Sequence, residues 1–272
     1  MTDYATPPAG LPGQNVMSTD RAMFTTAYAV IPRGVQRDIV TSSLPGWHDT
    51  RLWVLARPLS GFAETFSHYI MEVSDGGGST TPEPEGDAQG VLFVVAGTGT
   101  LTVAGQDHAI APGSYAYLPP GCDWALKGES GPLTFHWLRK LWVPGVGLEP
   151  AAAFVTREAD GTTVEMPGTD GAWSTTRFVD PGDLRHDMHV NIVNFEPGGT
   201  IPFAETHVME HGLYVLEGKA VYRLNRDWVE VEAGDYMWLR AFCPQSCYAG
   251  GPGRFRYLLY KDVNRHMPLR PL

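Results

Sequence analysis

The sequence contains few cysteines for its length. Its 272 residues include three, namely Cys122, Cys243 and Cys247, and an odd number in so long a chain does not make a disulfide framework. Cys243 and Cys247 could be interpreted as a thiol pair. However, the sequence around them shows neither a helix start nor a basic neighbour that would activate a thiol. We therefore expect small, buried cysteines in a reducing compartment.

Positive charge and long hydrophobic runs are also scarce. There are 20 basic and 30 acidic residues, which gives a formal net charge of −10, and no basic block is present. This composition argues against nucleic acid or an anionic membrane as a partner. The first residues hold no apolar stretch behind a basic head, and no later run approaches transmembrane length. We expect a cytoplasmic protein that binds a small molecule.

Glycine and proline are abundant, with 31 and 22 residues, mostly in short clusters between β-rich runs. This pattern is typical of many turns rather than long helices. Runs such as LWVLARP and VLFVVAG follow one another closely, which predicts an all-β sandwich or barrel. We expect an arm over 1–45, in which AMFTTAYAVIP could form a strand, a first domain over 46–144, a linker over 145–172 without this rhythm, and a second domain over 173–272.

The two halves repeat at a spacing of 121 residues. The pairs with this spacing are Gly97 and Gly218, Gly113 and Gly234, Cys122 and Cys243, His68 and His189, and Lys140 and Lys261. Each glycine marks a turn that the repeated fold needs, so a constant spacing indicates an internal duplication. The chain is predicted to contain two copies of one β-domain.

Three potential metal ligands, Glu205, His207 and His211, lie within seven residues. If Phe203–Val208 is a strand, Glu205 and His207 point to the same face because side chains alternate along a strand. Carboxylate and imidazole without thiolate suit zinc, iron(II), nickel or manganese. The sequence therefore predicts a metal site inside a β-structure.

The first copy lacks this cluster. The same spacing places Pro84, Gly86 and Gly90 at the three positions, and none of them has a metal-binding side chain. A single histidine, such as His68 or His136, is more often a core or surface residue than a ligand. Three ligands clustered in one copy and missing from the other favour a metal site in the second half.

The two halves resemble cupin domains, so the chain resembles a bicupin of two jelly-roll (double-stranded β-helix) barrels. The first cupin motif appears from Gly199 to Gly218, with its carboxylate and one imidazole exchanged. The second motif begins at Gly234 and has Gln245 at its histidine position. In the first copy Trp124 stands at that ligand position, so the resemblance implies a degenerate, metal-free N-terminal cupin.

The ligand set of Glu, His, His and Gln, together with ETHVMEHG and YKDVNR, resembles the (S)-ureidoglycine aminohydrolase family. The resemblance implies a manganese enzyme of ureide breakdown in purine catabolism, which releases ammonia from (S)-ureidoglycine and leaves (S)-ureidoglycolate. By the same resemblance, the metal ligands are Glu205, His207, His211 and Gln245, and the residues around the substrate are Tyr222, Tyr257 and Lys261.

Lys261 is the residue we expect to transfer protons, since burial near a metal disfavours its ammonium form. Glu205 is the alternative general base, and Tyr222 and Tyr257 would exchange hydrogen bonds with the substrate. Without the resemblance, such side chains are commonly rim residues. Another metal-dependent cupin, a dioxygenase or isomerase, and a non-catalytic binding cupin stay open as alternatives. Apolar strands favour a homo-oligomer.

Overall fold

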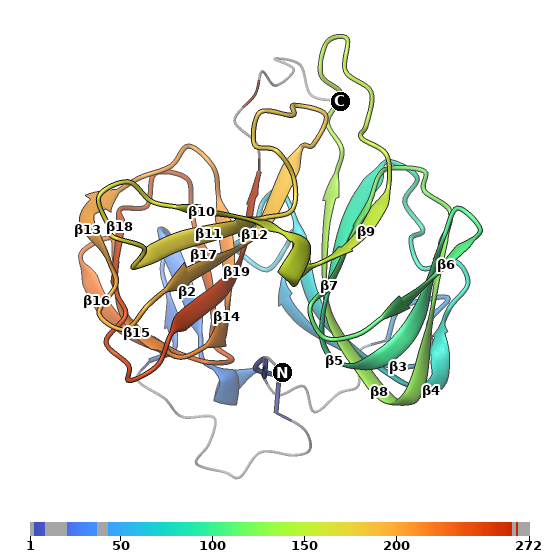
Figure 1. Ribbon diagram of the computed structural model, residues 1–272, viewed down its shortest axis with the longest axis horizontal. Helices are drawn as coiled ribbons and strands as arrows, with labels where there is room; N and C mark the ends of the chain where they lie inside the picture. The colour runs from blue at the N-terminus through green and yellow to red at the C-terminus, as the bar shows by residue number, and fades with distance from the viewer. Residues whose placement is uncertain (1–2, 9–20, 37–42, 263–264, 266–272) are drawn as a thin grey trace.

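The computed structural model describes residues 3–8, 21–36, 43–262 and 265. In this part of the chain the regular structure is β, apart from two short 3-10 helices, η1 (Arg33–Val35) and η2 (Glu158–Asp160). The strands form two barrels that lie side by side (Figure 1). No helix in the described ranges is long and apolar enough to cross a membrane. The predicted all-β fold with two barrels is confirmed.

The first barrel has a sheet of order β3-β4-β8-β5-β7-β9, and β6 pairs with β5. Its long strands bend around the barrel at glycine bulges. Gly97 has φ +75, and a Cβ there would lie 2.1 Å from the carbonyl oxygen of Pro132, so no other residue fits. The strands are β3 (His48–Ala56), β4 (Ser67–Ser79), β5 (Ala88–Val103), β6 (Gln106–Ile110), β7 (Ser114–Leu118), β8 (Trp124–Leu141) and β9 (Phe154–Arg157).

The second barrel has an eight-stranded sheet, β1-β2-β17-β14-β19-β12-β11-β10, and a four-stranded sheet, β13-β18-β15-β16. Gly218 occupies the same kind of bulge as Gly97, with φ +80 and a Cβ position 2.0 Å from a carbonyl oxygen. The strands are β10 (Thr162–Glu165), β11 (Trp173–Arg177), β12 (Met188–Phe195), β13 (Thr200–Glu205), β14 (His211–Glu217), β15 (Lys219–Leu224), β16 (Asp227–Glu232), β17 (Tyr236–Leu239), β18 (Gln245–Tyr248) and β19 (Phe255–Asp262).

The predicted arm belongs to the second barrel. Its AMFTTAYAVIP stretch forms β1 (Met23–Phe24) and β2 (Tyr28–Ile31), which confirms the expected strand as a short hairpin. The hydroxyl of Thr25 closes the turn by accepting the amide of Tyr28 at 2.9 Å. Strand β2 then pairs with β17. Residues 1–2, 9–20 and 37–42 of the arm lie outside the described residues.

The segment 145–172 was expected to lack strands, and this was wrong. Strand β9 pairs with β7 in the first barrel, and β10 pairs with β11 in the second. Both strands are four residues long, and β10 reads TTVE, which carries little apolar alternation. Such strands form because a sheet edge offers unpaired backbone groups. The local sequence pattern does not predict them. The predicted domain boundaries themselves stay a prediction.

Strand pairing supports the predicted 121-residue repeat in the strands that carry the first cupin motif and its counterpart. Gly90 of β5 pairs with Leu118 of β7, and His211 of β14 pairs with Leu239 of β17. Both pairs are related by 121 residues, which matches the spacing of the bulge glycines. The two copies therefore correspond at the predicted spacing in these strands.

Strand β8 of the first barrel and strand β19 of the second correspond at a spacing of 122 residues instead. After the bulge, Ala96 pairs with Thr134 of β8, whereas Glu217 pairs with Arg256 of β19. Ala96 and Glu217 are 121 residues apart, whereas their partners Thr134 and Arg256 are 122 residues apart. A single added residue before β19 changes the equivalence of every later residue on that strand.

Two equivalences drawn from the sequence are therefore wrong by one position. Lys261 corresponds to Arg139 and not to Lys140. His189 pairs with Lys261, and Ser67 pairs with Arg139, so His189 corresponds to Ser67. The match of two lysines at a spacing of 121 was a coincidence of sequence.

The three cysteines are free thiols. Cys243 and Cys247 are buried in the second barrel, and burial raises the pKa of both thiols. The expected burial is confirmed for Cys243 and Cys247, whereas Cys122 is half-buried.

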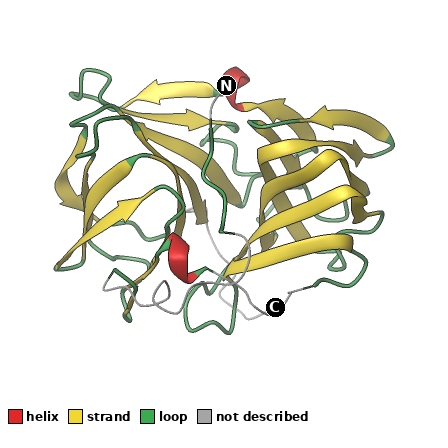
Figure 2. Ribbon diagram, turned by 90° about the horizontal axis from the view of Figure 1, so that it is seen from below, coloured by secondary structure: helices red, strands yellow, loops and turns green. Residues whose placement is uncertain are grey.

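The sheets of the two barrels lie on either side of the centre of the molecule (Figure 2). Apolar side chains from both barrels form a common core between them. Phe66 of the first barrel stacks on Tyr260 of the second, with ring centroids 3.8 Å apart. Separate clusters fill the interior of each barrel. Alternate residues of the facing strands therefore contribute to two different cores.

The carboxylate of Glu210 joins the barrels. It accepts the backbone amides of Glu64 and Thr65 at 3.0 and 2.7 Å, the Thr65 hydroxyl at 2.6 Å and the indole N–H of Trp238 at 3.2 Å. Glu210 is buried, and hydrogen bonds to a buried ionised acceptor are among the stronger ones in proteins.

We expect Glu210→Ala to lower the free energy of unfolding by about 2–4 kcal/mol, because several buried donors lose their acceptor. Urea unfolding followed by tryptophan fluorescence measures this change. Glu149→Ala, at an exposed position, is the matched control. Equal midpoints for the two variants would contradict the role of Glu210.

Two buried histidines of the first barrel meet at this interface. His68 Nε2 and His136 Nδ1 lie 2.9 Å apart, and His68 contacts the ring of Tyr236 while His136 contacts Tyr214. Burial lowers the pKa of His136 to about 3 and, together with the charge of His136, holds the pKa of His68 well below its ordinary value. Both imidazoles are therefore neutral in the folded protein.

This pair makes stability depend on pH. Below a pH of about 6.5 the unfolded chain binds protons at these histidines that the folded chain does not. Stability is thus lost as the pH falls from about 6.5 toward 3. In urea unfolding at pH 7 and at pH 4, we expect the midpoint of a His68→Gln/His136→Gln variant to fall less between the two pH values than the wild-type midpoint does. His48→Gln, at an exposed histidine, should keep the wild-type slope.

Candidate active site

A row of side chains crosses three neighbouring strands inside one end of the second barrel. His211 of β14 pairs with Lys261 of β19, which pairs in turn with His189 of β12. Residues paired in this way point to the same face. On β19, Tyr257 packs in the barrel core while Leu258 packs between the barrels. Lys261, an even number of residues from Tyr257, therefore faces the barrel interior with both histidines.

Glu205, His207 and Gln245 lie in contact beside this row. Gln245 Nε2 donates to Glu205 Oε1 at 3.3 Å, and His207 Nε2 is 3.3 Å from the same oxygen. The rings of His207 and His211 meet edge to face with centroids 4.9 Å apart. The four residues predicted as metal ligands thus form one continuous group of contacts, supplied by β13, the turn after it, β14 and β18.

The predicted strand Phe203–Val208 ends earlier than expected. Strand β13 stops at Glu205, opposite Gln245, the first residue of β18. Beyond this point no partner strand continues, and the carbonyl of His207 instead accepts the amide of Phe242 at 2.7 Å. Glu205 and His207 still meet, because the turn brings His207 back over the carboxylate rather than because a strand alternates.

The donor chemistry of this group fits a divalent cation, although the side chains are not spaced as a formed coordination shell. In the part of the chain that the structure describes, no three His, Cys, Asp or Glu side chains are arranged to hold a metal ion. Burial, the neighbouring His207 and Lys261 together lower the pKa of His211 to about 3. Its imidazole is therefore neutral, which is the form that binds metals.

Burial lowers the pKa of Lys261, and the charge of Arg177 lowers it further, while Asp262 acts in the opposite direction. The ammonium form is disfavoured because the side chain is largely removed from water. This environment agrees with the expectation from the sequence for a lysine that transfers protons.

The two tyrosines lie deeper in the barrel. Tyr257 and Tyr222 meet edge to face with centroids 6.2 Å apart, and burial raises the pKa of both. The neighbouring Cys247 and Glu205 add to the rise in the pKa of Tyr257. Tyr222 forms the next layer and contacts the site through Tyr257.

Sequence reasoning missed two residues that face the barrel interior beside this row. His189 and Asn191 are both buried and alternate along β12 with Val190 and Ile192, which pack between the barrels. Burial, followed by the charge of Lys261, lowers the pKa of His189 to about 4. The signal was present at the start of HVNIVNF, where the polar residues His189 and Asn191 alternate with Val190 and Ile192.

In the first barrel, aromatic rings line the corresponding space. Trp124, at the position of Gln245, meets Trp137 with centroids 5.6 Å apart, and Trp47 lies 6.2 Å from Trp124. A Cβ at Gly90, the position of His211, would lie 3.1 Å from Trp137 Nε1. This packing supports the prediction that the first copy binds no metal.

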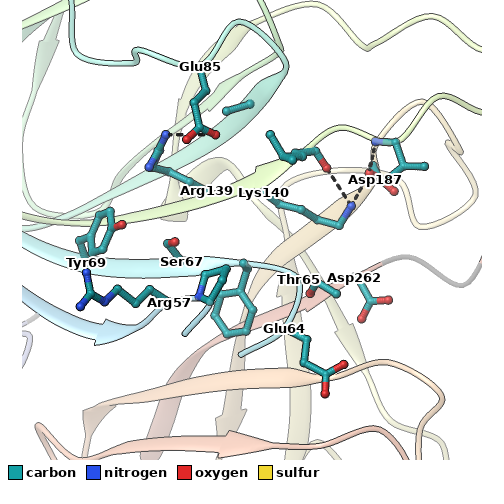
Figure 3. Close-up of a pocket in the computed structure, with 15 residues that line it drawn as sticks. Arg57, Glu64, Thr65, Ser67, Tyr69, Glu85, Arg139, Lys140, Asp187 and Asp262 are labelled. Carbon is teal, nitrogen blue, oxygen red and sulfur yellow. Dashed lines mark hydrogen bonds and ion pairs between the residues drawn. The ribbon is translucent and has the colours of Figure 1, made fainter. Parts of the chain in front are cut away.

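A cavity of about 470 Å³ opens between the two barrels (Figure 3). Its charged groups are partly paired with each other: Lys140 binds Asp187, and Arg139 lies 4.0 Å from Glu85. Asp262 lines this cavity and directly follows Lys261, so consecutive residues of β19 face the two sides. The cavity is therefore separated from the candidate metal site by the thickness of one sheet.

We expect His207→Ala to weaken binding of a divalent metal by more than the ~10–100-fold that is typical of losing an outer partner of a ligand. Metal bound after dialysis, measured by elemental analysis, tests this expectation. His48→Ala removes an exposed histidine and should keep the wild-type metal content. Full metal occupancy in the His207 variant would show that His207 is not a ligand.

Two family descriptions match the chain: residues 60–131 match the EutQ-like cupin domain, and residues 191–259 match the Cupin domain. The crystal structure of a putative glyoxylate-induced protein from Pseudomonas aeruginosa superposes on this chain with a TM-score of 0.93. The two sequences are 64% identical, and 100% of both chains is covered.

Curated relatives extend the comparison. (S)-Ureidoglycine aminohydrolase from Arabidopsis thaliana is 33% identical over 263 residues, which cover 93% of this chain and 81% of that protein. The Escherichia coli (strain K12) protein of the same name is 28% identical over 233 residues, with 85% and 87% covered. The predicted resemblance is confirmed over most of the chain. The chain therefore belongs to the (S)-ureidoglycine aminohydrolase family of bicupins.

Proposed function

We propose that this chain is a manganese-dependent (S)-ureidoglycine aminohydrolase of ureide and purine catabolism, which releases ammonia from (S)-ureidoglycine and yields (S)-ureidoglycolate. The observation that carries the proposal is the contact group of Glu205, His207, His211 and Gln245 beside Lys261 in one barrel. The names of the relatives support it. The proposal includes the cytoplasmic location and the homo-oligomer that the sequence suggests.

The proposed ligand set suits an anionic substrate. One carboxylate, two neutral imidazoles and an amide oxygen carry a single negative charge, so a bound divalent ion keeps net positive charge. Manganese fits this oxygen- and nitrogen-rich set without thiolate. When bound, the ion supplies an orienting charge for the substrate carboxylate. Glu205, His207, His211 and Gln245 would hold the ion, and Lys261 shares the barrel interior with His211, so it would be available to the amine of a substrate bound there.

Lys261 supplies the proton transfer in this proposal. Loss of ammonia requires a proton on the departing amine nitrogen and removal of a proton from the attacking water. Because burial lowers the pKa of Lys261, its Nζ exchanges a proton more readily at neutral pH than an exposed lysine does. The side chain shares the barrel interior with His211, one strand away, which puts Nζ beside the predicted ligands.

Tyr257 and Tyr222 act as hydrogen-bond donors in this scheme. Burial raises the pKa of both hydroxyls, so they stay protonated at neutral pH and do not serve as bases. Their rings belong to the apolar core of the barrel, which keeps bulk water away from this side of the proposed site.

The experiment that tests this function generates (S)-ureidoglycine in place from allantoate and follows ammonia release and product chirality, with and without manganese. We expect manganese-dependent ammonia release and (S)-ureidoglycolate. Oxygen uptake or activity restored by iron alone would indicate an oxidative cupin instead. Absence of ammonia release from the metal-loaded protein would favour a binding protein.

In the same assay we expect Lys261→Ala to lower kcat/KM by about 10²–10⁴-fold, the usual contribution of a general acid or base, with metal content unchanged. Lys261→Arg keeps the positive charge but cannot release a proton, so it should stay equally slow. Lys219→Ala, at an exposed lysine, is the control. Wild-type turnover in Lys261→Ala would remove this residue from the mechanism.

A further inference from the structure

Two buried polar atoms on β12 have no hydrogen-bond partner among the described residues: His189 Nε2 and Asn191 Oδ1. Each residue is 4% exposed, so water does not reach these atoms freely. A buried polar atom without a partner destabilises a protein unless a ligand or bound water completes it. Two such atoms on one strand, inside the barrel that holds the candidate active site, are candidates for contact with a polar ligand.

Both side chains face the inside of the second barrel. His189 and Asn191 are an even number of residues from Val193, which packs in the barrel core. Side chains alternate along a strand, so all three share that face. Val190, on the opposite face, packs between the two barrels.

Cross-strand pairing puts Asn191 between Lys261 and Tyr257, two of the three residues expected to contact the substrate. His189 is opposite Lys261, Asn191 is opposite Leu259, and Val193 is opposite Tyr257. Asn191 thus lies one row below Lys261 and one row above Tyr257. Side chains at such diagonal positions are within reach of each other.

The first copy gives a contrast. With β8 and β19 related by 122 residues, Tyr69, which pairs with Trp137, corresponds to Asn191. The ring of Tyr69 packs against Trp137 with centroids 6.0 Å apart. An amide at this position therefore occurs in the copy that holds the candidate active site, while an aromatic ring fills it in the copy that does not.

We propose that His189 and Asn191 bind the ureido group of the substrate; this inference rests on the proposed function. A ureido group is planar, with N–H donors on both nitrogens and one carbonyl acceptor. The asparagine amide presents one donor and one acceptor side, and a neutral imidazole presents one of each. The metal ligands and Lys261 then meet the other end of the molecule, at its carboxylate and amine.

The test compares two ligands of the manganese-loaded protein, (S)-ureidoglycolate, which carries the ureido group, and glycolate, which lacks it. Binding is measured by calorimetry. We expect Asn191→Ala to weaken binding of ureidoglycolate by about tenfold, the effect of losing a hydrogen bond to a buried group, and to leave glycolate unchanged. His189→Phe keeps a ring, removes both nitrogens and should give the same selective loss.

The matched control is Asn194→Ala on the same strand. Asn194 points out of the barrel, where it donates to Thr176 and accepts from Arg256, so its variant should bind both ligands as the wild type does. Three results for Asn191→Ala and His189→Phe would overturn the inference: equal weakening of both ligands, no weakening, or loss of bound metal. Each would show that the two residues have a structural role or no role, and not a role in binding the ureido group.

The outcomes separate this inference from the proposed function. A wild type that releases no ammonia from ureidoglycine contradicts the function, yet selective loss of ureidoglycolate binding in Asn191→Ala would still support the ureido site. Conversely, an active wild type whose ligand selectivity is unchanged in both barrel variants overturns the ureido site alone.

Discussion

The buried carboxylate of Glu210 is the contact on which the arrangement of this molecule depends. It holds the loop before β4 of the first barrel through two backbone amides and a hydroxyl. The next residue is His211, whose side chain faces the opposite way into the second barrel. Because successive residues of a strand point to opposite faces, one dipeptide connects the domain interface to the candidate metal site.

The same alternation brings the first barrel against the back of the candidate site. Asp262 accepts the amide of Glu210 at 3.1 Å on the interface side, and Lys261 faces the candidate site. The first barrel has aromatic rings where the second holds polar groups. Its contribution is a rigid apolar surface against which β14 and β19 lie.

The sequence predicted the fold, and it grouped donor side chains that the structure brings into contact, because glycine bulges and clustered donors are local signals. It failed where the signal was not local. The strands β9 and β10 form at sheet edges with little hydrophobic pattern, and one added residue before β19 shifted the equivalence of Lys261. Asn191 was missed because a polar residue in a strand becomes informative only when its buried face is known.

The pairing of β2 with β17 also bears on how the chain reaches its fold. Ile31 pairs with Tyr236, 205 residues later, so one edge of the second barrel is completed by a segment made long before it. Contacts this distant along the chain close slowly, and the segment must stay unpaired while the first barrel forms. During synthesis, β2 is thus an open edge available to any other chain that offers a strand like β17.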